Sequence, residues 1–265
     1  MTKMTDSYKL SVFEHGVGKP LVLLHGLIST HRYWNQVVEL MDQDSWKFIS
    51  PDLLGFGDSP KPKEGPYDLS QQVACVDESI TSIAKPPYRL VGHSMGAITA
   101  LKWAVDKPDL FNGLVLTSLP LLRSESQYRQ LATIVETKLF SRERIAKVGV
   151  HSLNWLNVIP ARMLKLQKIW PTHIVEDWKK HSRKAYRKIM QNAVFADQIL
   201  ALLAEVKVPT HVLIGSRDGM IGQSGIEQLQ NVVKVNKKLS LEIVSSAHNL
   251  PLEHPEIVVK AILQV

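Results

Sequence analysis

A serine between two glycines is the first feature of the sequence that could carry chemistry. In "LVGHSMGAITALKWA", residues 90–104, Ser94 lies two residues from Gly92 and two from Gly96. The residues before it are typical of a buried strand and those after it of an apolar helix, so Ser94 would occupy a tight strand-to-helix turn. Ser94 could simply cap this helix. It could also be a nucleophile, because the positive end of the helix would favour negative charge forming beside it.

A nucleophilic serine needs two partners, because its hydroxyl is a poor nucleophile at neutral pH. A histidine must accept its proton, and an acid must orient that histidine. His248 follows the strand-like "LSLEIV" and precedes the last helical pattern, while Asp218 follows the strand-like "HVLIG", 30 residues before His248. A solvated loop histidine and an ordinary turn aspartate are the alternatives to these roles.

Strand-like and helical patterns alternate through most of the chain. Apolar runs predict strands within residues 9–16, 20–26, 46–52, 88–94, 112–120, 209–218 and 239–247, and helical periodicity covers residues 70–84, 95–109, 226–235 and the segment after Pro255. Such alternation predicts an α/β fold with a mostly parallel central sheet and helices on both faces.

Five motifs in order resemble the landmarks of the α/β-hydrolase family: "LLHGLIST", "PDLLGFGDSP", "GHSMGA", "VLIGSRDGMI" and "SSAHNLPLEHPE". The resemblance covers essentially the whole chain and implies a catalytic triad in the family's order of serine, acid and histidine: Ser94, Asp218 and His248. It also implies an oxyanion hole formed by the backbone N–H groups of Leu27 and Met95. Within "PDLLGFGDSP" we expect Asp52 to bond local backbone groups.

A long helical region interrupts the alternation of strands and helices. We therefore predict a core domain over residues 1–119 and 206–265, with residues 120–205 forming a helical cap inserted between two strands. An insertion there would lie over the carboxyl edge of the sheet, where such folds place their sites.

The predicted cap carries the basic excess of the chain. It holds 15 Lys and Arg against 7 Asp and Glu, whereas the remainder holds 17 against 18. A stripe at helical spacing, which we call the basic stripe, comprises Lys180, Arg183, Lys184, Arg187 and Lys188. A solvated helix face is one explanation. The other is a dock for an acidic carrier protein, because related esterases cleave methyl esters from acyl groups on such carriers.

Composition bears on the compartment of the protein and on whether it binds membranes or nucleic acids. The single cysteine, Cys75, fits a reducing compartment, and the first residues lack the apolar run of a signal peptide, so we expect a cytoplasmic protein. The sequence contains no run of 18 uncharged apolar residues, so we expect no membrane-spanning helix. No basic run is interleaved with aromatic residues as in nucleic-acid modules.

These observations together predict a serine esterase of the carboxylesterase type, acting through an acyl-enzyme on Ser94 and needing no metal or organic cofactor. A thioester or lactone is also a possible substrate for this chemistry. Carbon–carbon bond hydrolases keep the serine but commonly place tryptophan directly after the histidine, where this chain has Asn249. A ligand receptor derived from a hydrolase is an alternative of another class, and turnover would distinguish it.

Overall fold

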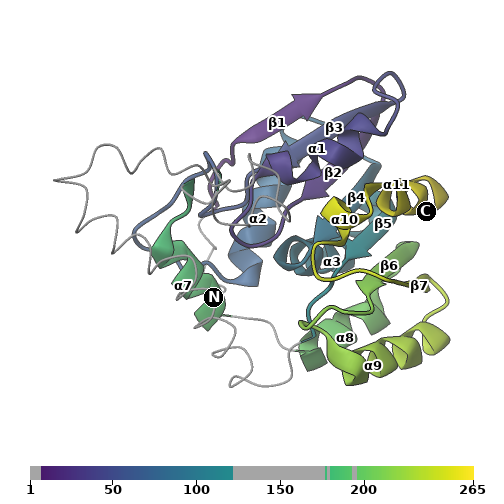
Figure 1. The fold of residues 1–265 in the computed structure, drawn as a ribbon. Coiled ribbons are helices and arrows are strands. Elements are labelled where there is room, and N and C mark those ends of the chain that lie inside the picture. The colour runs from purple at the N-terminus through teal and green to yellow at the C-terminus, as the bar shows by residue number, and fades with distance from the viewer. Residues whose placement is uncertain (1–6, 122–176, 178–179, 193–195) are drawn as a thin grey trace, which may run out of the picture.

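The computed structural model describes residues 7–121, 177, 180–192 and 196–265 (Figure 1). Its centre is a seven-stranded sheet with the strand order β1-β3-β2-β4-β5-β6-β7. Only β1 pairs antiparallel to its neighbour among these strands. The strands are β1 (Val12–His15), β2 (Lys19–Leu24), β3 (Trp46–Pro51), β4 (Tyr88–His93), β5 (Phe111–Thr117), β6 (Thr210–Gly215) and β7 (Leu239–Val244).

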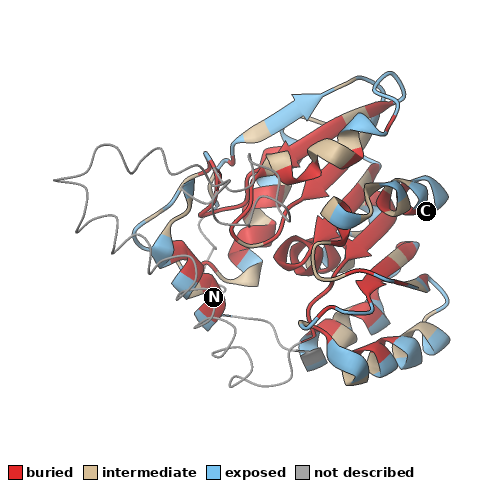
Figure 2. Cartoon of the chain, viewed as in Figure 1, coloured by how far each residue is buried: buried red, intermediate tan, exposed pale blue. Residues whose placement is uncertain are grey.

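Burial along the strands follows their place in the sheet. The four central strands β2, β4, β5 and β6 are buried over most of their length because helices cover both faces (Figure 2). The edge strands β1 and β7 alternate or expose their side chains. This pattern explains why the central strands appear in the sequence as continuous apolar runs.

Helices form a layer on each face of the sheet. One apolar core joins the sheet to α2 (Leu69–Thr81), α3 (Met95–Asp106), α8 (Ala196–Glu205) and α9 (Gly222–Val235). A second core joins the opposite face to η1 (His31–Trp34), α1 (Asn35–Glu39), α10 (Leu250–Glu253) and α11 (Pro255–Gln264). A short helical turn, η2 (Pro108–Leu110), leads into β5. The α/β class predicted from the alternating pattern is confirmed.

The connection between β5 and β6 includes most of the predicted cap, and residues 122–176, 178–179 and 193–195 of it lie outside the described residues. Within the described part, α7 (Arg183–Gln191) lies away from the sheet (Figure 1), whereas α8 packs against α3 and α9. The boundaries of the cap stay a prediction. Among the described helices, none has the length and apolar character to cross a membrane.

The order of the strands reverses between β2 and β4, because the chain runs from β2 outward to β3 and then crosses back to β4. The loops after β2 and β4 therefore leave the carboxyl edge of the sheet at a topological switch point. The segment at Leu27 follows β2 and Ser94 follows β4. Two of the predicted site segments thus meet at the topological switch point.

Candidate active site

Ser94 lies on a strained turn between β4 and α3. Its backbone angles are φ 54° and ψ −118°, a left-handed region that side chains rarely adopt. Such a conformation costs on the order of 1–3 kcal/mol and persists only where its surroundings enforce it. Gly96 is required here because a Cβ would collide with the carbonyl oxygens of Leu24 and His25. The close approach of α3 to β2 holds the turn in place and leaves Ser94 only 6% exposed.

His248 lies between Ser94 and Asp218 and bonds both. Its Nδ1 is 2.9 Å from Asp218 Oδ2, and its Nε2 is 3.0 Å from Ser94 Oγ. A carboxylate only accepts hydrogen bonds, so Nδ1 carries the proton and Nε2 is free to accept the hydrogen of the Ser94 hydroxyl. The structure therefore brings together three residues that the sequence separates widely, in the arrangement of a base held between an acid and a hydroxyl.

Local contacts fix the acid in its orientation. Asp218 Oδ1 accepts a hydrogen bond of 2.8 Å from the N–H of Met220, and the side chain of Asp218 is fully buried. The Asp-Gly turn predicted at this place is present, so Asp218 combines the turn geometry with the contact to His248. The two readings of Asp218 that the sequence left open are compatible.

The loop that carries His248 is held by Glu253, a residue that the sequence analysis missed. Glu253 Oε2 accepts hydrogen bonds from Ser246 Oγ at 3.0 Å and from the N–H of Ala247 at 3.1 Å. Its position inside "SSAHNLPLEHPE" was visible, but the motif alone does not reveal that the carboxylate turns back onto the loop.

His93, inside the G-x-S-x-G motif, is a second neighbour that the sequence analysis did not single out. Its ring lies 5.1 Å from that of His248 and stacks on Tyr33 at 4.7 Å between centroids. Burial lowers the pKa of His93 well below its ordinary range, and the neighbouring His248 and His25 lower it further. His93 therefore stays neutral and packs beside the ring of His248, and it is not a second residue that accepts and donates protons.

The turn after β2 lies directly against the serine. A Cβ on Gly26 would lie 3.2 Å from Ser94 Cβ and 3.0 Å from the ring of His93. Leu27 is the next residue along this turn. Met95 is the first residue of α3, and the N–H of a first helical residue has no acceptor within the helix. Both predicted oxyanion donors thus stand beside Ser94 in the chain or in space.

His25 attaches this turn to the loop after β3. The N–H of Leu53 donates to His25 Nε2 at 2.9 Å, and His25 Nδ1 donates to the carbonyl of Gly26 at 2.7 Å. Burial lowers the pKa of His25, so the ring stays neutral and keeps this pattern of one donor and one acceptor. His25 consequently fixes the backbone one residue before Leu27.

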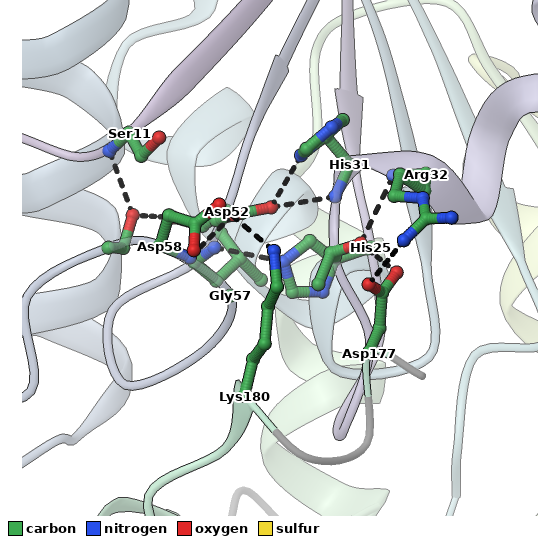
Figure 3. A network of polar contacts seen from close by, with 12 residues as sticks. Ser11, His25, His31, Arg32, Asp52, Gly57, Asp58, Asp177 and Lys180 are labelled. Atoms are coloured by element: carbon green, nitrogen blue, oxygen red, sulfur yellow. Dashed lines mark hydrogen bonds and ion pairs between the residues drawn. The ribbon is translucent and has the colours of Figure 1, made fainter. Parts of the chain in front are cut away.

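Asp52 bonds local backbone groups, as predicted from its motif (Figure 3). It accepts from the N–H of His31 at 2.7 Å and from the N–H of Asp58 at 2.8 Å, and its Oδ1 is 3.0 Å from His31 Nδ1. Burial opposes ionisation, but the contacts with His31, His25 and Asp58 prevail and lower the pKa of Asp52 to about 2. An ionised, buried Asp52 therefore joins the loop after β3 to the loop after β2.

Three lysines of the basic stripe contact the loop at residues 57–66, although much of the stripe is exposed to solvent. Lys180 Nζ is 3.2 Å from Asp58 Oδ2, and Lys184 Nζ is 3.2 Å from Glu64 Oε1. Lys188 Nζ donates to the carbonyl of Gly65 at 2.7 Å. Three lysines of the stripe therefore have partners within the chain, a use that neither sequence-based explanation of the stripe included.

Asp177 is the site neighbour that no sequence signal indicated. It is fully buried and accepts from Thr30 Oγ1 at 2.5 Å and from Arg32 Nη1 at 3.0 Å (Figure 3). Thr30 lies close to Leu27 along the chain, so a carboxylate from the β5–β6 connection reaches the turn after β2. No group of three His, Cys, Asp or Glu side chains within the described ranges is arranged to hold a metal ion.

Comparison with known proteins identifies the family of the chain. The model of the alpha/beta hydrolase fold family matches residues 19–255. The chain therefore belongs to the alpha/beta hydrolase fold family, as its ordered motifs predicted.

Several curated relatives and solved structures are similar to this chain. The probable lysophospholipase BODYGUARD 4 of Arabidopsis thaliana is 25% identical over 238 residues, covering 78% of this chain and 55% of that protein. The chain spans about half the length of this relative and of BODYGUARD 5. An enol-lactonase from Burkholderia xenovorans LB400 superposes with a TM-score of 0.75 at 16% identity, covering 96% of this chain and 95% of that one. A thioesterase domain from the curacin biosynthetic pathway superposes with a TM-score of 0.68 at 20% identity, covering 96% and 94%. At these identities the two structures support the fold alone.

Proposed function

We propose that this protein is a serine hydrolase that cleaves a carboxylic ester through an acyl-enzyme on Ser94. The observation that carries the proposal is the position of His248, with one ring nitrogen 3.0 Å from Ser94 Oγ and the other 2.9 Å from Asp218. The strain at Ser94 adds support, because energetically costly backbone conformations cluster at functional sites.

The proposed reaction has two halves. Ser94 Oγ attacks the ester carbonyl while His248 Nε2 takes its proton, and the N–H groups of Leu27 and Met95 bind the resulting oxyanion. The intermediate collapses to an acyl-enzyme as His248 returns the proton to the departing alkoxide oxygen. Water, deprotonated by His248, then attacks the acyl carbon. The bond to Ser94 Oγ breaks as His248 returns the proton to that oxygen, and the acid is released. Asp218 stays ionised and stabilises the imidazolium formed in both halves.

One relative supports an ester as the substrate class, because BODYGUARD 4 is a probable lysophospholipase. Thioesters and lactones react through the same acyl-enzyme, so they belong to the same proposal. Carbon–carbon cleavage and ligand reception use the same fold, but no contact of the described site favours either of them.

Covalent labelling tests the proposal directly. A fluorophosphonate should modify Ser94 in the native protein, and Ser94→Ala should lose both labelling and ester turnover with its fold intact. We expect a loss of about 10³-fold or more in kcat/KM for p-nitrophenyl esters of graded chain length. A Ser94→Ala variant that keeps full turnover would refute the assignment. A labelled protein that turns over only once would indicate a receptor.

A cap over residues 120–205 and an acidic carrier are finer parts of this proposal. Three lysines of the basic stripe bind the loop at residues 57–66, so attraction of a carrier would depend on the charge that they leave exposed. Reversing Arg183, Arg187 and Lys188 to glutamate should raise KM several-fold for an acyl-carrier ester and leave a small neutral ester unchanged if a carrier docks there. Equal effects on both substrates would assign the stripe to attachment of α7 alone.

A further inference from the structure

The turn that carries the proposed oxyanion donor of Leu27 is itself strained. Ile28 has φ 56°, which is a genuine outlier for a β-branched residue. A turn of this kind relaxes unless contacts on both sides hold it. The position of the Leu27 N–H therefore depends on what fixes the backbone before and after Ile28.

The core holds the upstream side. His25 is fully buried and bonds both the N–H of Leu53 and the carbonyl of Gly26. The core also contributes on the downstream side, where the carboxylate of Asp52 accepts from the N–H of His31 at 2.7 Å.

Further support on the downstream side comes from the β5–β6 connection. Asp177, fully buried, accepts from Thr30 Oγ1 at 2.5 Å and from Arg32 Nη1 at 3.0 Å. The hydroxyl of Thr30 accepts in turn from the N–H of Arg32 at 3.2 Å, which caps η1. Asp177 thus binds Thr30 and Arg32, while Asp52 binds His31, which lies between them in the chain (Figure 3). One of these two carboxylates belongs to the sheet domain and the other to the β5–β6 connection.

We propose that Asp177 is a positioning residue for the oxyanion hole, which it sets by fixing the Thr30–Arg32 segment directly after the strained Leu27–Ile28 turn. The inference rests on the proposed function. It means that a residue of the β5–β6 connection contributes to the site, because its contacts with Thr30 and Arg32 place the Leu27 N–H toward the reacting oxygen.

Other contacts of the same connection end elsewhere and provide a matched comparison. Lys180 and Lys184 attach it to Asp58 and Glu64, on the loop at residues 57–66. These two ion pairs hold the same stretch of chain but do not touch the turn after β2. Loss of attachment and loss of positioning can therefore be separated.

The first experiment compares Asp177→Asn with the double variant Asp58→Asn/Glu64→Gln. Asp177→Asn removes a carboxylate of the connection, and the double variant removes two carboxylates that bind it, by the same kind of substitution. We measure the rate of phosphonylation of Ser94 by a fluorophosphonate, whose P=O oxygen occupies the oxyanion hole, together with kcat and KM for p-nitrophenyl acetate. Asp177→Asn should lower kcat and the phosphonylation rate at least 10-fold while KM changes less than 3-fold, because only transition-state binding depends on the hole. The double variant should stay within 2-fold of the native rates.

A second pair of variants guards against loss of folding in Asp177→Asn. Thr30→Val removes the hydroxyl that Asp177 binds, and Thr30→Ser keeps it, so only the valine variant should lose kcat and phosphonylation. Circular dichroism and thermal melting identify folded variants. The inference is overturned if Asp177→Asn matches the double variant, if its effect is on KM alone, or if Thr30→Val and Thr30→Ser behave alike. Absence of Ser94 labelling in the native protein would instead overturn the proposed function.

Discussion

At the scale of single residues, the site depends on how tightly the imidazole of His248 is held. Asp218 bonds one ring nitrogen, Ser94 lies at the other, and the ring of His93 packs behind. The loop bearing His248 is in turn tied to Glu253 by two hydrogen bonds. The rate of proton transfer depends on the alignment of His248 with the Ser94 hydroxyl to within tenths of an ångström. Each of these contacts helps to keep that alignment.

Removing the tie at Glu253 should therefore reduce catalysis. Glu253→Gln replaces a carboxylate that accepts from Ser246 and Ala247, so the loop should loosen and kcat/KM should fall about 10-fold, with the melting temperature almost unchanged because Glu253 is exposed. Glu256→Gln is the matched control, since that carboxylate contacts only the exposed ring of His254 in the described structure. Ester hydrolysis and thermal melting measure the outcome, and equal rates for the two variants would contradict the role given to Glu253.

The pH dependence of the rate should report one histidine. His248 accepts a proton only when its ring is neutral, so the rate should rise as pH increases on the acid side of the pH profile. Burial lowers the pKa of His93 well below its ordinary range, so His93 stays neutral there. The logarithm of kcat/KM for a neutral ester should consequently rise with a slope of about one on the acid side. A slope of two in this measurement, or a rate that falls between pH 5 and pH 8, would be inconsistent with the assignment.

At the scale of elements, the close packing of α3 against β2 places the serine. Gly96 lies where the helix passes the carbonyl oxygens at the end of β2, and no side chain fits there. The neighbouring strands β2 and β4 are paired up to Leu24 and Gly92, so the turns that follow them leave the sheet side by side. Helix packing and strand pairing together determine where Ser94 meets the turn at Leu27.

Gly96→Ala tests this packing. The added methyl group should push α3 away from β2, lower the free energy of unfolding by about 1–3 kcal/mol and reduce ester turnover by displacing Ser94 and Met95. Gly219→Ala is the control, because a Cβ at Gly219 meets no atom within 4 Å. Denaturant unfolding and ester hydrolysis should separate the two variants. Similar stability of both would show that α3 does not need its close approach to the sheet.

At the scale of the whole molecule, several buried titratable groups make stability depend on pH. Burial lowers the pKa of His25 and His93, and lowers that of His181 to about 3. In the unfolded chain these histidines bind protons near pH 6.5, whereas in the folded protein they do not. Below about pH 6.5 the unfolded state therefore binds more protons than the folded state. The free energy of unfolding must consequently fall as pH decreases below this value.

His181→Gln should weaken that dependence. One histidine that protonates only on unfolding costs about 1.4 kcal/mol per pH unit, so His181 accounts for roughly 2 kcal/mol of the loss in unfolding free energy between pH 6.5 and pH 5. The variant should lose less stability over this interval than the native protein, as measured by urea unfolding at both pH values. His15→Gln, which removes an exposed imidazole, is the control. An unchanged loss in His181→Gln would contradict the depressed pKa.

Asp52 adds to the acid sensitivity in a lower window. Its carboxyl has a pKa of about 2 in the folded protein, below the ordinary value of an aspartate. The stability that it contributes is fully present above about pH 4 and is lost as pH falls towards 2. Unfolding should therefore depend on the buried histidines below about pH 6.5, and on Asp52 in addition below about pH 4.

The sequence by itself determined the elements and the main residues of the candidate site. Apolar runs and helical periodicity depend on neighbours in the chain, so the strands of the sheet and the long helices α2, α3, α9 and α11 followed from local pattern. Ser94, Asp218 and His248 could be named because each directly follows a predicted strand, within motifs that resemble one family. The short helices α1 and α10 carried too little periodicity to be predicted.

Only the tertiary structure decided which distant groups meet. Three sets of contacts could not be predicted from local sequence. Asp177 contacts Thr30 and Arg32, Glu253 contacts the loop of His248, and lysines of the basic stripe contact residues 57–66. Charge counts predicted a basic surface, but they could not reveal that three of its lysines bind partners in the same chain. Hydrogen bonds and ion pairs depend on distances of about 3 Å. Such distances are set by the packing of helices and sheet, which no local pattern of residues encodes.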